Sequence, residues 1–165
     1  MGNQSYKLYC RLKSYHPEDK KRYSWDDRGM CRLYSDVFRD ILRYNSTAKE
    51  WYMYDGRIWK EDREGMYAQK KAKIFVEALV IYSNSIKDDA TRIEFLKLVS
   101  KYGQYRGRKT LVDDARSEEV ITQADLDSYD NLYNCKNGIF DLDTATVSKR
   151  TRDFLSKNEK QKNII

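Results

Sequence analysis

The acidic pair Asp141 and Asp143 is the arrangement in this sequence that comes nearest to a catalytic motif. On one β-strand, residues two apart point to the same face, so both carboxylates could hold magnesium for primase-type nucleotidyl transfer. Such chemistry also needs a third acidic group and a histidine near the nucleotide phosphates, and the single histidine, His16, lies far away in a polar stretch. We therefore favour the alternative that Asp141 accepts hydrogen bonds at a turn, and expect no catalytic or metal-binding residue.

Nucleophilic catalysis and ATP hydrolysis are not indicated either. A serine triad would have to use His16. Cys10, Cys31 and Cys135 are far apart, odd in number and outside any CxxC spacing, which predicts neither a disulfide framework nor a zinc site and is typical of a reducing cytoplasm. No G-x-x-x-x-G-K-[ST] phosphate-binding loop occurs, so we expect no cofactor in this chain.

The segment 101–109 has a composition suited to nucleic acid. It contains no acidic residue and places tyrosines between lysines and arginines, a pattern that can follow phosphates and stack on bases. The predicted nucleic-acid-binding residues are Lys101, Tyr105, Arg106, Arg108 and Lys109, together with Arg57 at an exposed turn. An ordinary exposed linker between two helices is an equally weighted alternative for 103–109.

Composition limits the class of protein. A chain of 165 residues fits one domain, and 40% apolar residues with 14 Tyr and 3 Trp exclude a fully disordered protein. The net charge of +6 favours a polyanionic partner, because neutralised phosphates release counterions. The most apolar stretch, Ile74 to Ile81, is too short to span a bilayer, so we expect no membrane association.

Apolar periodicity predicts helices at 35–45, 67–86 and 90–102, the last capped by Asp88 or Asp89. Gly103 is the expected stop of that helix, and a more acidic helix is expected at 110–119.

Two β-hairpins are predicted. The first runs from Trp51 to Trp59 around Asp55-Gly56, whose positive φ angles would suit a type I′ turn, and the second spans 132–142 around Asn137-Gly138. The alternating aromatic residues of the first hairpin favour core packing over base stacking.

The predicted fold class is α+β and mainly helical, with amphipathic helices and two hairpins in a single compact domain. We expect an N-terminal arm or connector at residues 1–28, the domain itself at 29–144, and a basic, flexible tail at 145–165.

The order of these features resembles a known family. The stretches "YSDVFRDILRYNSTAKEWYMYDGRIW" and "DLDSYDNLYNCKNGIFDLDT" are similar to the poxvirus-primase-type N-terminal domain that precedes the motor of phage and plasmid superfamily III helicases. The resemblance runs from about Trp25 to Thr144. It is carried by an aromatic hairpin, a Leu126-Asp127 step and a late asparagine-glycine signature. The matching motif residues are Trp51, Asp55, Gly56, Trp59, Asn134, Asn137, Gly138, Asp141 and Leu142.

The sequence departs from the family pattern at three places. Tyr133 stands where leucine is usual, Asp143-Thr144-Ala145 replaces an arginine-threonine-glycine step, and the histidine-proline stretch leading into the motor is absent. The resemblance fits both a segment of a longer helicase and a short chain that carries the accessory domain alone.

The resemblance implies a non-catalytic accessory domain of a DNA-replication primase-helicase, acting in DNA engagement and in assembly of an oligomeric ring. The implied partners are single-stranded or forked DNA and helicase motor domains or subunits, in the cytoplasm of a bacterial host of phage or mobile-element origin. ATP and magnesium would belong to the motor. The alternatives are a stand-alone protein-interaction regulator of a helicase, and a magnesium-dependent nucleotidyl transferase that uses Asp141 and Asp143.

Overall fold

The computed structural model describes residues 2–151 and 153–157. It is 45% helical and 17% strand, which confirms the α+β, mainly helical class. Contacts group the described residues into two compact units. The first holds the residues up to Arg39 and Gly65–Glu119, and the second holds Asp40–Glu64 and the residues from Val120 onward.

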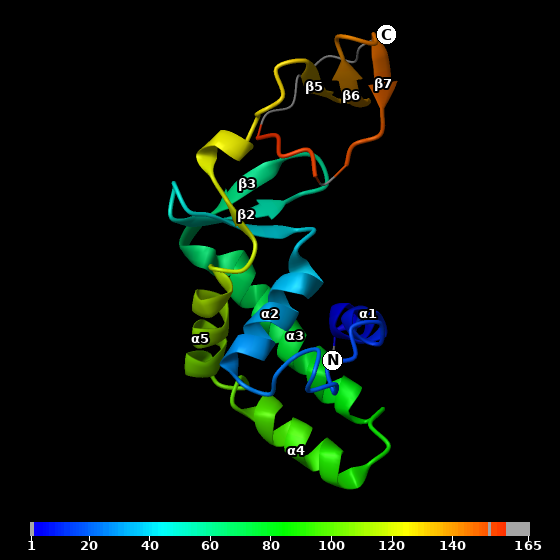
Figure 1. Cartoon of the computed structure of the whole chain (residues 1–165), viewed down its shortest axis with the longest axis vertical. Helices are drawn as coiled ribbons and strands as arrows, with labels where there is room; N and C mark the ends of the chain where they lie inside the picture. The colour runs from blue at the N-terminus through cyan, green and yellow to red at the C-terminus, as the bar shows by residue number, and fades with distance from the viewer. Residues whose placement is uncertain (1, 152, 158–165) are drawn as a thin grey trace. The chain divides into compact units, whose positions relative to one another are not determined.

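The first unit is built from helices (Figure 1). They are α1 (Asn3–Leu12), α2 (Asp27–Phe38), α3 (Met66–Ser83), α4 (Asp89–Ser100) and α5 (Tyr105–Ala115). Helix α3 contacts α1, α4 and α5, and α2 packs on α5. Their shared core includes Leu33, Phe75 and Leu79, none of them measurably exposed. Part of the segment 1–28, expected as an arm or connector, is helix α1, which buries Leu8 and Leu12.

Helix α2 begins eight residues before the predicted start at 35. The Asp26 carboxylate accepts a hydrogen bond from the Gly29 N–H at 2.9 Å and so caps the first turn. The Ser24 hydroxyl and the Gly29 N–H hold the pKa of Asp26 below its ordinary value, so the cap stays charged. The predicted helix 35–45 is wrong after Phe38, because α2 ends there and Leu42–Asn45 pairs as a strand.

The remaining helices follow the predicted order with shifted ends. Helix α4 is capped by Asp88, whose carboxylate accepts from the Thr91 N–H at 2.8 Å, as predicted. The expected linker 103–109 is wrong, because α5 begins at Tyr105 and ends at Ala115 instead of spanning 110–119. Residues 105–109 of the basic segment therefore form the first half of α5.

The second unit contains a four-stranded sheet in the order β3-β2-β1-β4. Its strands are β1 (Leu42–Asn45), β2 (Glu50–Tyr54), β3 (Trp59–Asp62) and β4 (Val120–Ile121). β1, β2 and β3 are antiparallel neighbours, and β4 pairs in parallel with β1. Tyr52 and Trp59 pack with Ile121 and Leu126 in the core of this unit.

The first hairpin is confirmed, but its turn is not the predicted type I′. Tyr54 pairs with Trp59, which leaves four connecting residues. Of these, Gly56 alone has a positive φ, at 98°. The Asp55 carboxylate accepts from the N–H groups of Arg57 and Ile58, at 2.9 and 3.0 Å, and so holds the longer turn.

The second hairpin is also confirmed and carries an unpredicted third strand. β5 (Leu132–Cys135) pairs with β6 (Gly138–Asp141), and β6 pairs with β7 (Thr146–Ser148). Cys135 faces Gly138, so Gly138 ends the turn instead of sitting at its centre. The structure differs from the flexible tail expected from residue 145, since β7 is paired and Phe154 and Ser156 are buried. Residues 158–165 of that tail lie outside the described part of the chain.

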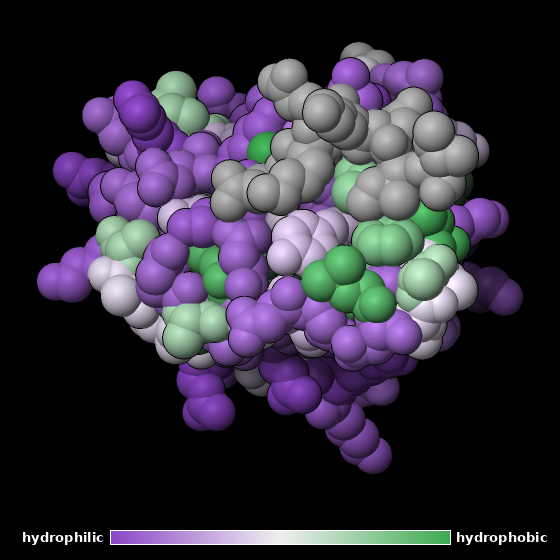
Figure 2. Space-filling view, turned by 90° about the horizontal axis from the view of Figure 1, so that it is seen from above, coloured by the Kyte–Doolittle hydropathy of each residue, from purple (hydrophilic) through white to green (hydrophobic). Residues whose placement is uncertain are grey.

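The exposed surface is largely polar. Figure 2 shows a mostly hydrophilic face on which hydrophobic side chains form small groups. Within the described residues, no helix is long and apolar enough to cross a membrane.

Asn134 links the two hairpins within the second unit. It is 4% exposed. Its amide donates to the Arg57 carbonyl at 2.9 Å and accepts from Nε of Arg150 at 2.8 Å. The Arg150 guanidinium also donates to the Cys135 carbonyl. A family-motif residue is thus a buried connector between a turn and a sheet.

We expect Asn134→Ala to lower the free energy of unfolding by about 1–3 kcal/mol, because it leaves a buried carbonyl and a guanidinium short of a partner. Urea denaturation followed by circular dichroism measures this. Asn131→Ala is the matched control, because the one hydrogen bond of the Asn131 side chain among the described residues is an exposed bond to Asp143, and its effect should stay within about 0.5 kcal/mol. Equal losses in the two variants would contradict the connector role.

Candidate nucleic-acid interface

The cations predicted from segment 101–109 gather where α4 ends and α5 begins. We call this surface the α4–α5 corner and define it by Lys101, Tyr105, Arg106, Arg108 and Lys109. All of these side chains are exposed except Arg108, which is half-buried. Tyr105 is 63% exposed and lies among the cations, so a base could stack on its ring.

Gly107 makes the corner possible. A Cβ atom at this position would overlap the Lys101 carbonyl oxygen and lie 2.9 Å from the Tyr102 Cα. Only glycine lets the backbone of α5 approach the end of α4 so closely. The Tyr102 hydroxyl extends this contact to the start of α2 by donating to the Asp27 carboxylate at 2.6 Å.

The corner cations are not equally available. Lys109 forms an ion pair with Asp113 at 2.7 Å, and Arg108 donates to the Gly103 carbonyl. Nε of Arg108 is buried and finds no partner among the described residues. Arg108 therefore braces the turn between the helices. Lys101 and Arg106 have no carboxylate within ion-pair distance in the part of the chain that the structure describes, so their charges face solvent.

Arg57, the sixth predicted residue, belongs to the second unit. It is exposed on the turn of the first hairpin, and its carbonyl accepts the Asn134 hydrogen bond. The structure thus brings five of the six predicted residues together and places Arg57 on a separate unit.

The aromatic residues of the first hairpin are interior. Trp51, Tyr52 and Trp59 are 5%, 2% and 1% exposed, which agrees with core packing and leaves them no face for a base. Tyr54 is half-buried against the same core.

The acidic pair at the end of β6 sits in a turn. β6 ends at Asp141, so Asp141 and Asp143 do not share a strand. The Asp141 carboxylate accepts from the Asp143 N–H at 2.8 Å, and Asp143 accepts from Asn131 at 2.7 Å. Among the described residues, no three His, Cys, Asp or Glu side chains group closely enough to hold a metal ion. The turn role is the one these contacts support.

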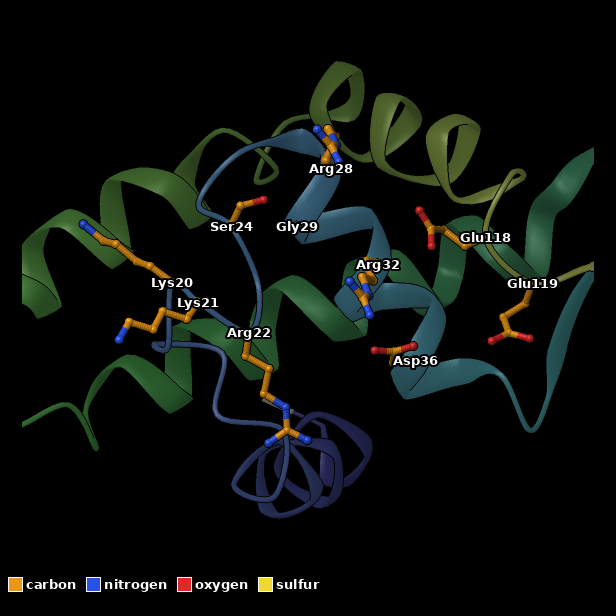
Figure 3. A pocket seen from close by; sticks show the side chains of 10 residues that line it. All are labelled: Lys20, Lys21, Arg22, Ser24, Arg28, Gly29, Arg32, Asp36, Glu118 and Glu119. Atoms are coloured by element: carbon orange, nitrogen blue, oxygen red, sulfur yellow. The ribbon is translucent and has the colours of Figure 1, made fainter.

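A second group of cations lies in the first unit, at a place that the sequence argument treated as plain surface. Arg28 and Arg32 of α2 and Lys21 of the preceding segment line one cleft with Glu118 and Asp36 (Figure 3). The four-residue spacing of Arg28 and Arg32 was the available signal, but the predicted helix began only at 35.

The cysteines differ in their surroundings. All three are free; Cys10 is exposed and Cys31 and Cys135 are buried. The Cys31 thiol can donate to the Arg28 carbonyl at 3.2 Å or to Glu118 at 3.7 Å. Burial and the nearby carboxylate of Glu118 raise the pKa of Cys31 to about 12.

Comparison with known proteins gives the family. The sequence matches the family described as "D5 N terminal like" over residues 27–161, which is most of the chain. The chain belongs to the D5 N-terminal-like family. That family is the N-terminal domain of D5-like phage and poxvirus primase-helicase proteins and is not itself a catalytic motor domain. Searches of curated proteins and of solved structures found no match. The resemblance inferred from the hairpin motifs is confirmed.

In this D5 N-terminal-like domain, Gly107→Ala should destabilise the first unit by about 1–3 kcal/mol, because the added methyl group forces α4 and α5 apart. Thermal unfolding measures the loss. Gly103→Ala is the matched control, since its nearest neighbour would be the Ser100 carbonyl oxygen at 3.2 Å. A Gly107→Ala protein as stable as the control would show that the close approach is dispensable.

Alkylation should distinguish the cysteines at pH 8. A thiol reacts as the thiolate, and a pKa of about 12 leaves Cys31 almost wholly protonated. Iodoacetamide followed by peptide mass spectrometry should therefore find Cys10 modified in the native protein and Cys31 unmodified until denaturant is added. Equal rates at both cysteines in the native state would contradict the buried position of Cys31.

Proposed function

We propose that this D5 N-terminal-like chain is a non-catalytic accessory domain of a DNA-replication primase-helicase that holds single-stranded or forked DNA at the α4–α5 corner. The observation that carries the proposal is the exposed Tyr105 between Lys101 and Arg106, whose charges face solvent. The net charge of +6 and the primase-helicase family support it.

The charges of α5 add a physical argument. Arg106, Arg108 and Lys109 lie in its first half, whereas Asp113 and Asp114 lie in its last turns. A helix is stabilised by acidic groups at its start and basic groups at its end, so this order opposes the helix dipole. These cations make the helix less stable, and binding of an external anion would account for their position.

The mechanism is electrostatic. Lys101 and Arg106 contact successive phosphates and release counterions, and Tyr105 stacks on a base of any identity. Lys109 contributes less, because Asp113 already neutralises it. Arg108 supports the turn on which the other residues stand. Binding should show little sequence preference and fall steeply with salt.

The decisive variant is Lys101→Ala/Arg106→Ala, which spares Arg108 and so preserves the turn. Fluorescence anisotropy on a labelled single strand should show a loss of about tenfold. The slope of log K against log salt should be shallower by about 1.4, corresponding to two lost contacts. Tyr105→Ala should weaken binding to single strands more than to a duplex, because only unpaired bases can stack.

Lys70→Ala/Lys73→Ala is the matched control, because it removes two exposed charges from α3 in the same unit. Its salt slope should equal that of the unmodified protein. If the corner and control variants bind alike, the corner is not the interface.

The assembly part of the proposal rests on the same helix. The cationic start of α5 and its acidic end, which continues into Glu118 and Glu119, suit head-to-tail contact between subunits. Light scattering after size exclusion, with and without a motor-bearing relative, tests it. A chain that stays monomeric and never co-migrates would leave DNA binding as its whole contribution.

A further inference from the structure

The cleft beside α2 has the properties of a binding site distinct from the α4–α5 corner. It lies within the first unit, between the 20–24 segment and α2, and has a volume of about 450 Å³ (Figure 3). This size falls in the range of small-ligand pockets, ~300–1,000 Å³. Its lining is almost entirely charged or polar, which suits a hydrated, charged ligand.

The two walls of the cleft are held close by their backbones. A Cβ atom on Gly29 would overlap the Ser24 carbonyl oxygen, so α2 and the preceding segment touch here. The Asp26 carboxylate ties the walls by accepting from the Ser24 hydroxyl at 2.7 Å and from the Gly29 N–H at 2.9 Å. These contacts fix the spacing of the two walls.

Five cations line the cleft, of which two are committed and three are available. Lys20 pairs with Glu94 at 2.8 Å and lies 4.2 Å above the ring of Trp25, and Arg22 donates to the Ser14 carbonyl at 3.5 Å. In contrast, Lys21, Arg28 and Arg32 have no carboxylate within ion-pair distance among the described residues. These three are the cations of the cleft that an anion could contact.

Arg28 and Arg32 lie one turn apart on the same helix. Like charges at this spacing repel and destabilise an isolated helix. A bound anion would remove that repulsion, and the guanidinium fork matches the oxygens of phosphate. The pair is therefore better suited to a phosphate group than to a monovalent counterion.

One end of the cleft, beside Arg32, is acidic (Figure 3). Asp36 accepts a hydrogen bond from the Tyr23 hydroxyl at 2.7 Å, and Glu118 accepts the Cys31 thiol. Each carboxylate has further acceptor capacity for a hydroxyl or amino group. A phosphate backbone that ran through the cleft would meet these like charges, so an extended strand does not fit. A ligand with a phosphate at one end and hydroxyl or amino donors at the other does.

We propose that this cleft binds a nucleotide through its terminal phosphate, with Lys21, Arg28 and Arg32 on the phosphate and Glu118 and Asp36 on sugar hydroxyl or base amino groups. The nucleotide is either a free nucleoside phosphate or the 5′-phosphorylated end of a strand. The site is separate from the internal phosphates held at the α4–α5 corner and does not depend on them.

Isothermal titration calorimetry on the full chain tests the proposal with ATP, with a short single strand carrying a 5′ phosphate, and with the same strand carrying a 5′ hydroxyl. ATP binding identifies a free nucleotide. A preference of about tenfold for the 5′-phosphorylated strand, the amount expected from charge-assisted hydrogen bonds, identifies a strand end. Absence of ATP binding together with equal affinity for the two strands would overturn the proposal.

Arg28→Gln/Arg32→Gln should abolish the ATP affinity or the 5′-phosphate preference, whichever the unmodified protein shows. Both side chains are exposed, so the variant should fold, and circular dichroism checks this. Lys70→Gln/Lys73→Gln removes the same charge from α3 and should keep the property. If both variants lose it equally, or neither does, the cleft is not the site.

Glu118→Gln examines the acidic end of the cleft. It should weaken ATP several-fold and leave tripolyphosphate unaffected, since tripolyphosphate has no sugar or base. If ATP binds more tightly instead, Glu118 repels the ligand and its assigned role is wrong.

Circular single-stranded DNA has no end, so it reports on the α4–α5 corner alone and separates failure of that proposal from failure of this one.

Discussion

Two glycines inside helices control how the first unit is put together. Gly107 lets α5 touch the end of α4, and Gly29 lets α2 touch the segment that precedes it. Both lie in the first turn of their helices, and both positions require glycine because a Cβ atom there would overlap a backbone carbonyl oxygen. The Tyr102–Asp27 hydrogen bond connects the two contacts. Both cationic surfaces of this unit, the corner and the cleft, rest on this shared constraint.

The sequence predicts the elements better than their ends, and the errors have physical causes. The Asp88 cap and both hairpins were predictable, because capping residues and Gly-containing turns act locally. The helix expected at 35–45 mixes the end of α2 with β1, since Leu42 falls at helical spacing and also pairs with Met53 across the sheet. The two glycines of segment 103–109 suggested a linker. Gly107 is required because the end of α4 lies against it, and the local sequence does not reveal this contact. β7 was missed because its burial pattern is wholly exposed and shows no alternation.

The candidate site was also predictable only in part. Residue types alone pointed to Lys101, Tyr105 and Arg106, which do lie together. They could not show that Lys109 is paired with Asp113 or that Arg108 folds back on Gly103, since both contacts follow from the helix replacing a loop. The cleft was hidden for a related reason. Six residues separate Lys21 from Arg28 in the sequence, and the Ser24–Gly29 contact brings their segments together.

Three of the family-motif residues have structural roles. Asp55 and Asp141 accept backbone N–H groups in turns, and Asn134 joins the first hairpin to the second sheet. All three belong to the second unit, whereas the corner and the cleft belong to the first. The residues that identify the family therefore specify a scaffold, and ligand contacts can change without touching them. This separation explains how an N-terminal domain can be recognisable by its turns while the binding surfaces proposed for it depend on the placement of a few cations on α2, α4 and α5.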